Sequence, residues 1–368
     1  MAKRIRLACT AAALVPLALL AAACSSSSST PAASKSSPAA AALNASGKSI
    51  SETGSTLLFP LFGTWQTAYS TANAAVTITS GATGSGTGIA DASEGLVNIG
   101  ASDAYLSAAD LEKYPGLLNI PLAVASVDVY YNLPGVKSLN LNGTVLAQIY
   151  TGKITAWNDP AIAKLNPGAS LPSTKIVTLH RADSSGSSFL FTSYLSAQDP
   201  SAWPASNVGT TITWPSAPGA LAETGSGGMV TGCGGTKGCI AYIGISYQAK
   251  ATAAGLASAA LANKAGKFVQ DTPASVGAAL ASFPAAPSSG AESLINTSAA
   301  TGYPITNYEY AIVKKTQPSA AESKAVTAFL SWILTTGDSA KNLSTVGFVA
   351  LPSATLSTAQ SLVSSIGK

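Results

Sequence analysis

The sequence predicts an α/β fold with mainly parallel sheets covered by helices. Short runs rich in β-branched or aromatic residues alternate along the chain with longer helical segments. This alternation is typical of parallel strands joined by helical crossovers. At 368 residues and 47% hydrophobic composition, the chain can bury a substantial core and exceeds the usual size of one domain. We therefore expect two lobes.

Five segments are expected to be strands, because each is rich in β-branched or aromatic residues and is bounded by Gly, Pro or Ser. In chain order they are VTIT at 76–79, VNIGAS at 97–102, KIVTLHR at 175–181, CIAYIGIS at 239–246 and YEYAIVKK at 308–315. Seven segments are expected to be helices. In chain order these lie at 58–72, 88–95, 111–114, 142–152, 187–199, 275–283 and 320–337.

Three loops rich in Gly, Ser and Thr each lead into an expected helix. They are TGSTL at 53–57, TGSGTGI at 83–89 and DSSGSSF at 183–189. Their hydroxyl side chains suit helix N-caps, and the first backbone N–H groups of a helix remain free to bind an anion. Any one such loop is ordinarily a turn or a cap. If the three helix N-termini converge, they form an uncharged cradle for an anion.

Arg181 is the only arginine after residue 24, and it stands beside the only histidine, His180. A guanidinium presents a planar fork of donors, which suits an oxyanion better than an ammonium does. Arg181 is therefore a candidate anion ligand, although with Asp183 it could form no more than a surface ion pair. Neighbouring residues of a strand point to opposite faces, so we expect His180 to pack or to lie at the surface.

Residues 1–23 have the pattern of a bacterial export signal. Lys3, Arg4 and Arg6 precede an apolar stretch at 14–20, and Ala21 to Ala23 lead into Cys24. Small residues before a cysteine resemble a lipoprotein signal, so we expect Cys24 to carry lipid; an ordinary secretory signal is the alternative. Residues 24–48, mostly Ser, Ala and Pro, have the composition of a flexible tether. No later segment has about 20 uninterrupted apolar residues, as a membrane-spanning helix requires.

Cys233 and Cys239 remain once Cys9 leaves with the signal and Cys24 takes lipid. In an oxidising extracytoplasmic compartment, two cysteines in the Gly-rich run CGGTKGC most simply form a local disulfide. A metal site would need further ligands, which one histidine cannot supply. We expect neither a metal nor another cofactor.

The chain beyond the tether is expected to be nearly neutral. Five of the 20 Lys and Arg residues and none of the 16 Asp and Glu residues precede Ser51, which leaves 15 basic against 16 acidic side chains. Nucleic-acid binding would require clustered Lys and Arg on a basic surface. The composition therefore argues against a nucleic-acid partner.

Four motifs occur in a distinctive order: GST at 54–56, GSGTGI at 84–89, NIGASDAYLS at 98–107 and HRADSSGSSFLF at 180–191. In this order and spacing they resemble the phosphate-binding proteins that supply phosphate-specific ABC transporters. The Gly-rich run alone is a weak signal, because it lacks the Gly-Lys-Ser/Thr ending of a nucleotide-binding P-loop. The resemblance runs from about residue 50 to the C-terminus. It implies a two-lobed periplasmic-binding-protein fold of type II, with 49–125 and 303–368 in lobe I, 126–302 in lobe II, and a hinge that the chain crosses twice.

The resemblance also implies a phosphate site between the lobes and no catalytic residue. The implied ligands are Thr56, the amide of Leu57, Ser85 and Asp103 from lobe I, and Arg181, Ser185, Gly186 and Ser187 from lobe II, with Asp183 steadying the guanidinium. Leu57 stands where some members have an aromatic residue, and Ser187 where many have threonine. Neither departure removes a polar donor. The implied partners are inorganic phosphate, the permease subunits of an ABC importer and, through the lipid anchor, the outer face of the cell membrane; we expect a monomer.

Asp103 is the expected source of selectivity. Phosphate near neutral pH still carries a proton, whereas sulfate does not, so a buried carboxylate gains a hydrogen bond from phosphate and repels sulfate. A site built to bond a ligand hydroxyl rejects the analogue that lacks it by about 10⁴-fold or more. Without the resemblance, Asp103 would more often be a cap or a turn residue.

Two other classes of function remain as alternatives. A secreted hydrolase could use Ser85 or Ser185 with His180, but its base must be held against the nucleophile and oriented by a carboxylate. A two-metal phosphatase would need several more His and Asp ligands. The same fold could also bind sulfate, molybdate or a phosphorylated organic ligand. We expect a binding protein and not an enzyme.

Overall fold

The computed structural model describes residues 49–368, which belong to a single compact unit of the chain. The export signal predicted at 1–23, the tether at 24–48 and the lipid-bearing Cys24 lie outside the described residues. In the part that is described, no helix is both long and apolar enough to cross a bilayer.

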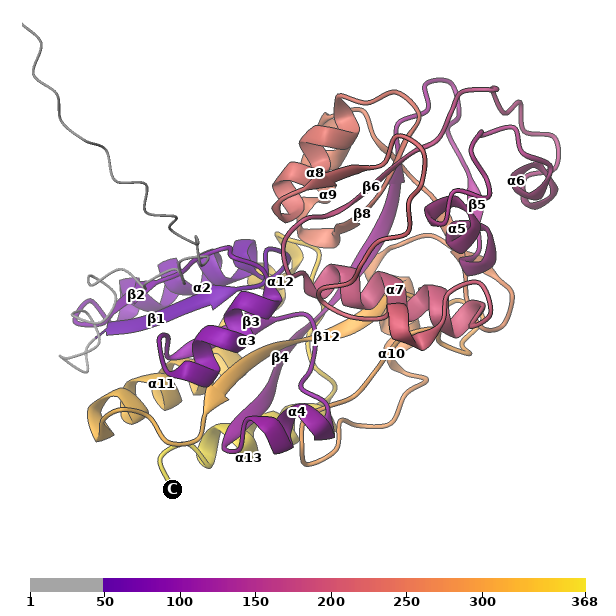
Figure 1. The fold of residues 1–368 in the computed structure, drawn as a ribbon. Helices are drawn as coiled ribbons and strands as arrows, with labels where there is room; N and C mark the ends of the chain where they lie inside the picture. The colour runs from indigo at the N-terminus through magenta and orange to yellow at the C-terminus, as the bar shows by residue number, and fades with distance from the viewer. Residues whose placement is uncertain (1–48) are drawn as a thin grey trace, which may run out of the picture. The chain divides into compact units, whose positions relative to one another are not determined.

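The described chain is organised around one large mixed sheet (Figure 1). Its strands lie in the order β2 (Thr77–Thr79), β1 (Ser49–Gly54), β3 (Ile99–Ser102), β12 (Thr306–Lys314), β4 (Leu117–Tyr131), β8 (Cys239–Gly244), β6 (Val177–Arg181) and β7 (Leu221–Glu223), and β9 (Ala257–Ser258) also pairs with β4. A small second sheet contains β5 (Asn140–Leu141), β10 (Ala260–Ala262) and β11 (Phe268–Val269). The five predicted strands are confirmed as β2, β3, β6, β8 and β12.

Parallel pairing is found in the outer parts of the large sheet. There β1 pairs with β2 and β3, and β6 pairs with β7 and β8, all in parallel. The central strands form the antiparallel part of this mixed sheet: β12 is antiparallel to both β3 and β4, and β4 is antiparallel to β8. Strand β12, from late in the chain, lies between β3 and β4.

Strand β4 joins the two parts of the sheet, and it was not predicted. Residues 117–126 pair with β12, whereas residues 127–131 pair with β8. In Figure 1, β4 runs from the part of the sheet beside β12 to the part beside β8. Its side chains are almost all buried, so its sequence shows no alternation of polar and apolar residues. Pro121 within it also argues against a strand when only the sequence is considered.

Twelve α-helices are described in residues 49–368. They are α2 (Phe59–Ala72), α3 (Ser85–Glu94), α4 (Ala108–Lys113), α5 (Gly143–Tyr150), α6 (Pro160–Leu165), α7 (Gly186–Gln198), α8 (Gly225–Gly234), α9 (Gln248–Ala253), α10 (Pro273–Leu280), α11 (Ala320–Trp332), α12 (Ala340–Ser344) and α13 (Ser353–Ser364). The seven predicted helices correspond to α2, α3, α4, α5, α7, α10 and α11. Helix α8 escaped prediction because it contains five glycines, which are poor helix formers.

The hydrophobic core is one continuous cluster with two regions rich in aromatic rings. In one region, Phe62 of α2 packs edge-to-face against Trp65 and against Phe329 of α11. In the other, Tyr242 of β8 stacks on Phe191 of α7 with ring centroids 4.6 Å apart. These contacts hold α2 and α7 in place, and the N-termini of both helices carry predicted site residues.

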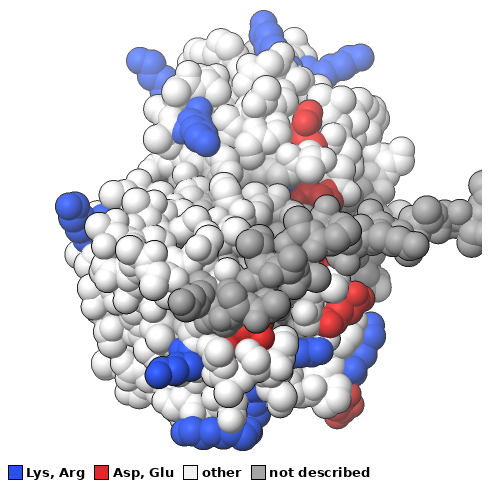
Figure 2. All heavy atoms as spheres, turned by 90° about the vertical axis from the view of Figure 1, so that its left-hand side faces the viewer, with Lys and Arg blue, Asp and Glu red and all other residues white. Residues whose placement is uncertain are grey.

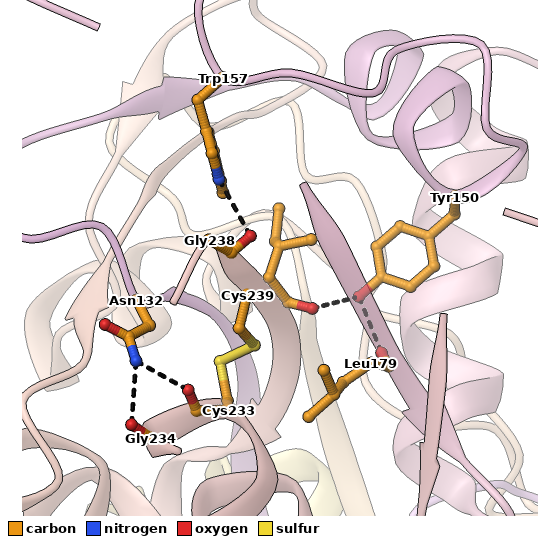
Figure 3. The surroundings of a disulfide bond; sticks show 9 residues. Asn132, Tyr150, Trp157, Leu179, Cys233, Gly234, Gly238 and Cys239 are labelled. Carbon is orange, nitrogen blue, oxygen red and sulfur yellow. Dashed lines mark hydrogen bonds between the residues drawn. A yellow bond between two sulfur atoms is a disulfide. The ribbon is translucent and has the colours of Figure 1, made fainter. Parts of the chain in front are cut away.

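The predicted disulfide between Cys233 and Cys239 is present, with Cα atoms 5.3 Å apart (Figure 3). It ties the last turn of α8 to the first residue of β8. Asn132 donates from its side chain to the carbonyl oxygens of Cys233 and Gly234. Trp157 donates to the carbonyl of Gly238 at 3.0 Å. The Gly-rich segment between Cys233 and Cys239 is therefore held at both ends.

Asp128 and Asp271 are buried acids beside the point where β4 changes partners. Asp128 accepts hydrogen bonds from the backbone N–H of Val129 at 2.7 Å and from the Tyr303 hydroxyl at 3.3 Å. Burial nevertheless raises the pKa of Asp128 to about 7. Burial, and then the charge of Asp128, raise the pKa of Asp271 well above its ordinary value. Both carboxyls therefore hold protons more tightly in the folded chain than in the unfolded chain.

The contribution of Asp128 to the free energy of unfolding is expected to fall as pH rises from about 4 toward 7. In this range the unfolded chain loses the Asp128 proton near the ordinary pKa of 3.8, whereas the folded chain keeps it up to about 7. Asp128→Asn, which mimics the protonated acid, should make the pH dependence less steep. Glu112→Gln, at an exposed position, should leave it unchanged. Urea unfolding at a series of pH values measures the slope, and equal slopes in wild type and Asp128→Asn would contradict the assignment.

Candidate functional site

The residues predicted to bind a ligand come together in one buried polar cluster. Thr56, Ser85, Asp103, Arg181, Ser185 and Ser187 are each no more than 5% exposed. They lie at or next to the N-termini of α2, α3 and α7, and at the ends of β3 and β6. Gly86 of α3 donates its backbone N–H to the carbonyl of Ser184, just before α7, at 3.1 Å. The predicted convergence of helix N-termini is therefore observed.

Asp103 lies at the centre of this cluster, directly after β3. Its carboxylate accepts a hydrogen bond from Ser187 at 2.9 Å and another from Ser55. Its backbone N–H donates to the hydroxyl oxygen of Ser85 at 3.2 Å. An added Cβ on Gly186 would lie only 2.6 Å from the Cβ of Asp103, so only glycine permits this approach of α7. Asp103 thus contacts residues from all three predicted loops.

Arg181 and Asp183 form a two-pronged pair within the loop between β6 and α7. The guanidinium donates from Nε to one carboxylate oxygen at 2.7 Å and from Nη2 to the other. The Arg181 side chain is 2% exposed and that of Asp183 is 14% exposed, so this is not a surface ion pair. Burial acts to raise the pKa of Asp183, but the charge and hydrogen bonds of Arg181 outweigh it, and the pKa is lowered. The pair fixes the plane of the guanidinium.

The other predicted donors have defined local roles. The Ser185 hydroxyl oxygen accepts from the N–H of Ser188 at 3.2 Å and so caps α7. The amides of Thr56 and Leu57 precede α2 and have no intrahelical acceptor. The Leu57 side chain is fully buried, and its carbonyl accepts from Ser246 at 2.7 Å. A backbone amide, and not the side chain, is therefore what Leu57 offers to a ligand.

A fourth helix N-terminus, that of α8, also reaches the cluster and was not predicted. The Ser226 hydroxyl is hydrogen-bonded to the Thr56 hydroxyl at 2.8 Å, and the Ser226 N–H donates to the same Thr56 oxygen at 3.2 Å. The N–H of Gly225 donates to Asp183 at 3.1 Å. The run TGSGG at 224–228 has the same composition as the three predicted loops, so this signal was visible in the sequence. Ser55, which donates to the Asp103 carboxylate, was also missed.

His180 packs against an aromatic ring, as predicted. Its ring is stacked on that of Trp214 with centroids 5.0 Å apart. Burial lowers the pKa of His180 below its ordinary value. The hydrolase alternative requires a serine hydrogen-bonded to His180. Among residues 49–368 this pairing is not observed: the His180 ring is stacked on Trp214, Ser85 contacts Asp103, and Ser185 caps α7.

Arg181 is the cation of this cluster, and its charge is matched by Asp183. The remaining donors are neutral hydroxyls and backbone amides. On the face drawn in Figure 2, most of the described surface is uncharged, and Lys and Arg lie mostly toward its upper and lower ends, with one group at the middle of the left edge. This arrangement can bind an anion through neutral donors and one guanidinium, while the Asp103 carboxylate accepts a hydrogen bond from a protonated ligand oxygen.

The fold and the buried site place the chain in the periplasmic-binding-protein class. A family model described as a PBP superfamily domain matches residues 29–336. The phosphate-binding protein PstS of Xylella fastidiosa is 32% identical over 306 residues, covering 82% of this chain and 81% of the relative. The protein of the same name from Methanocaldococcus jannaschii is 33% identical over 290 residues, covering 73% and 74%. The chain therefore belongs to the PstS family of phosphate-binding proteins.

Solved structures share the fold. A phosphate-binding protein from Stenotrophomonas maltophilia superposes with a TM-score of 0.65 at 22% identity, covering 85% of this chain and 93% of that chain. A substrate-binding protein of a putative phosphate ABC transporter from Clostridium perfringens, with bound phosphate, gives a TM-score of 0.60 at 20% identity, covering 83% and 100%. These likenesses confirm the two-lobed α/β architecture.

Proposed function

We propose that this protein captures inorganic phosphate between two lobes and delivers it to the permease of an ABC importer. The observation that carries the proposal is the buried cluster in which Asp103 and the Arg181–Asp183 pair are surrounded by neutral donors. One guanidinium and several hydroxyls and amides can offset the desolvation of a phosphate dianion, because each hydrogen bond to a charged group contributes about 1.5–3 kcal/mol. The names and the family of the relatives agree with this ligand.

The proposed ligand shell is the predicted one. It consists of Thr56, the amide of Leu57, Ser85, Asp103, Arg181, Ser185, Gly186 and Ser187, with Asp183 orienting the guanidinium. Ser226 joins it through its contact with Thr56. Asp103 would accept the proton of phosphate, whereas the other groups would donate to its remaining oxygens. Sulfate carries no proton for Asp103 to accept, and so the same shell would reject it.

The proposed lobes are 49–125 with 303–368, and 126–302. The change of partner along β4, from β12 to β8 between Ser126 and Val127, supports the first boundary. The Tyr303 hydroxyl donates to the carbonyl of Val127 at 3.1 Å, which supports placing the second crossing beside the first. Neither lobe alone completes the ligand shell, so closure of the two lobes about this hinge would enclose the ligand.

The proposed location is the outer face of the cell membrane, with a lipid on Cys24 and the segment 24–48 as the tether. The export pattern at 1–23 and the small residues before Cys24 support this placement. The protein would act as a monomer that docks on the permease subunits. Its role would be binding and delivery, without catalysis.

Equilibrium dialysis with radiolabelled phosphate tests the proposed function. We expect saturable binding of one phosphate per chain that a large excess of unlabelled sulfate does not displace. A parallel assay with a chromogenic phosphate ester should show no release of the chromophore. Absence of saturable phosphate binding, displacement by sulfate, or turnover of the ester would each contradict the proposal.

A further inference from the structure

Glu309 lies opposite Asp103 across two paired strands. Strand β12 is antiparallel to β3, with Tyr310 opposite Ser102. The next position along this register places Glu309 opposite Asp103, and opposite residues of an antiparallel pair have side chains on the same face. The Asn307 side chain donates to the backbone carbonyl of Asp103, which shows that β12 continues alongside the chain beyond the end of β3.

The Glu309 carboxyl is sealed from solvent and has no conventional donor. The residue is 0% exposed, and neither carboxyl oxygen accepts a hydrogen bond from an N–H or O–H group in residues 49–368. The ionisable group that acts on it is Asp103, the residue opposite it on the neighbouring strand. Two carboxyls can share a hydrogen bond only when one of them keeps its proton. The pair therefore holds one proton.

The surroundings of the two carboxyls decide which of them is protonated. Asp103 accepts hydrogen bonds from Ser55 and Ser187. Glu309 has no comparable donors, and burial followed by the charge of Asp103 raises the pKa of Glu309 well above its ordinary value. Arg181 is already paired with Asp183. The proton accordingly belongs to Glu309.

We propose that Glu309 is a positioning residue for ligand selectivity, whose protonated carboxyl donates a hydrogen bond to Asp103. The proposal rests on the proposed function. A carboxylate has about four lone-pair sites. Ser55, Ser187 and Glu309 occupy three of them, so Asp103 keeps one site for one proton of the ligand. Glu309 thus fits the site to an oxyanion with a single proton and keeps two negative carboxylates from facing that anion.

This arrangement links phosphate binding to the proton of Glu309. The ionisable groups that interact with Glu309 are Asp103, across the strand pair, and Tyr310, its neighbour on β12. On β4, the residue opposite Glu309 is Ala123, which does not ionise. Burial and the charge of Asp103 raise the pKa of Glu309, so the free protein loses this proton above the usual range of a glutamate. A bound anion beside Asp103 favours the protonated form further, so binding in the pH range where Glu309 titrates should take up a proton.

Calorimetric titration of phosphate in buffers with different ionisation enthalpies counts this proton. The full chain is titrated at a series of alkaline pH values, where inorganic phosphate itself carries one proton. We expect uptake to grow with pH in wild type and to be absent in Glu309→Gln, whose amide still donates to Asp103 but cannot ionise.

Glu52→Gln is the matched control. Glu52 is a second buried glutamate of the same sheet, 3% exposed, whose pKa is raised by burial and not by Asp103. The Glu52→Gln variant should take up protons on phosphate binding as wild type does. Equal uptake in wild type and Glu309→Gln, or no uptake in wild type, would overturn the proposal for Glu309. If Glu309→Gln did not fold, Glu309→Met would serve the same comparison. Failure of wild type to bind phosphate at all would contradict the proposed function instead.

Discussion

Replacing Arg181 by alanine is expected to weaken phosphate binding by about 1,000-fold or more. The change removes the one guanidinium of the cluster, whose hydrogen bonds to an anion contribute about 1.5–3 kcal/mol each. It also leaves the carboxylate of Asp183 unpaired near the ligand, where its charge repels the anion. A loss of about 4 kcal/mol in binding free energy corresponds to about a thousandfold change in the dissociation constant. Isothermal titration calorimetry with phosphate measures this change in the dissociation constant.

Three variants separate the loss of the guanidinium's hydrogen bonds from the effect of the unpaired Asp183 carboxylate. Arg181→Lys keeps the charge but lacks the planar fork, so its affinity should fall between those of wild type and Arg181→Ala. Asp183→Asn keeps the guanidinium and should weaken binding by about tenfold through loss of its fixed orientation. The double variant Arg181→Ala, Asp183→Asn removes the stranded carboxylate and should bind phosphate better than Arg181→Ala alone. Affinity of Arg181→Ala within tenfold of wild type would contradict a direct role for the guanidinium.

Asp103→Asn is expected to reduce the preference for phosphate over sulfate by about 10³- to 10⁴-fold. The carboxylate accepts the proton of phosphate and repels unprotonated sulfate, whereas an amide can also donate and so tolerates both ions. Asp183→Asn should change this preference much less, because that carboxylate is turned toward Arg181 and Gly225. Calorimetric titration with each ion, for wild type and both variants, gives the ratio of dissociation constants.

The comparison of the two aspartates makes this test specific. Both are carboxylates of the same cluster, Asp103 buried and the Asp183 side chain 14% exposed, and both change by the same substitution. A general loss of structure would weaken both ions in proportion and leave the ratio unchanged. An unchanged phosphate preference in Asp103→Asn would remove Asp103 from its proposed role in selectivity.

Local signals predicted the elements that are stabilised by local interactions. Helix α7 begins at the predicted loop because Ser185 caps it, and the pairing of Arg181 with Asp183 spans only two residues. The short strand β6 was visible because its β-branched residues, Val177 and Thr178, differ from the loops around it. Strand β4 and helix α8 were missed. The first is buried along almost its whole length, and the second is rich in glycine, so each depends on tertiary contacts and not on its own periodicity.

The sequence by itself determined the α/β class, the disulfide and the family, along with the set of polar residues expected to meet a ligand. Only the tertiary structure decided which of these residues touch, since Thr56 and Ser226 are 170 positions apart and share no pattern. It also revealed Glu309, whose place opposite Asp103 follows from the antiparallel register of β12 with β3. A register between distant strands is set by the packing of the whole core, and for that reason no local run of residues encodes it.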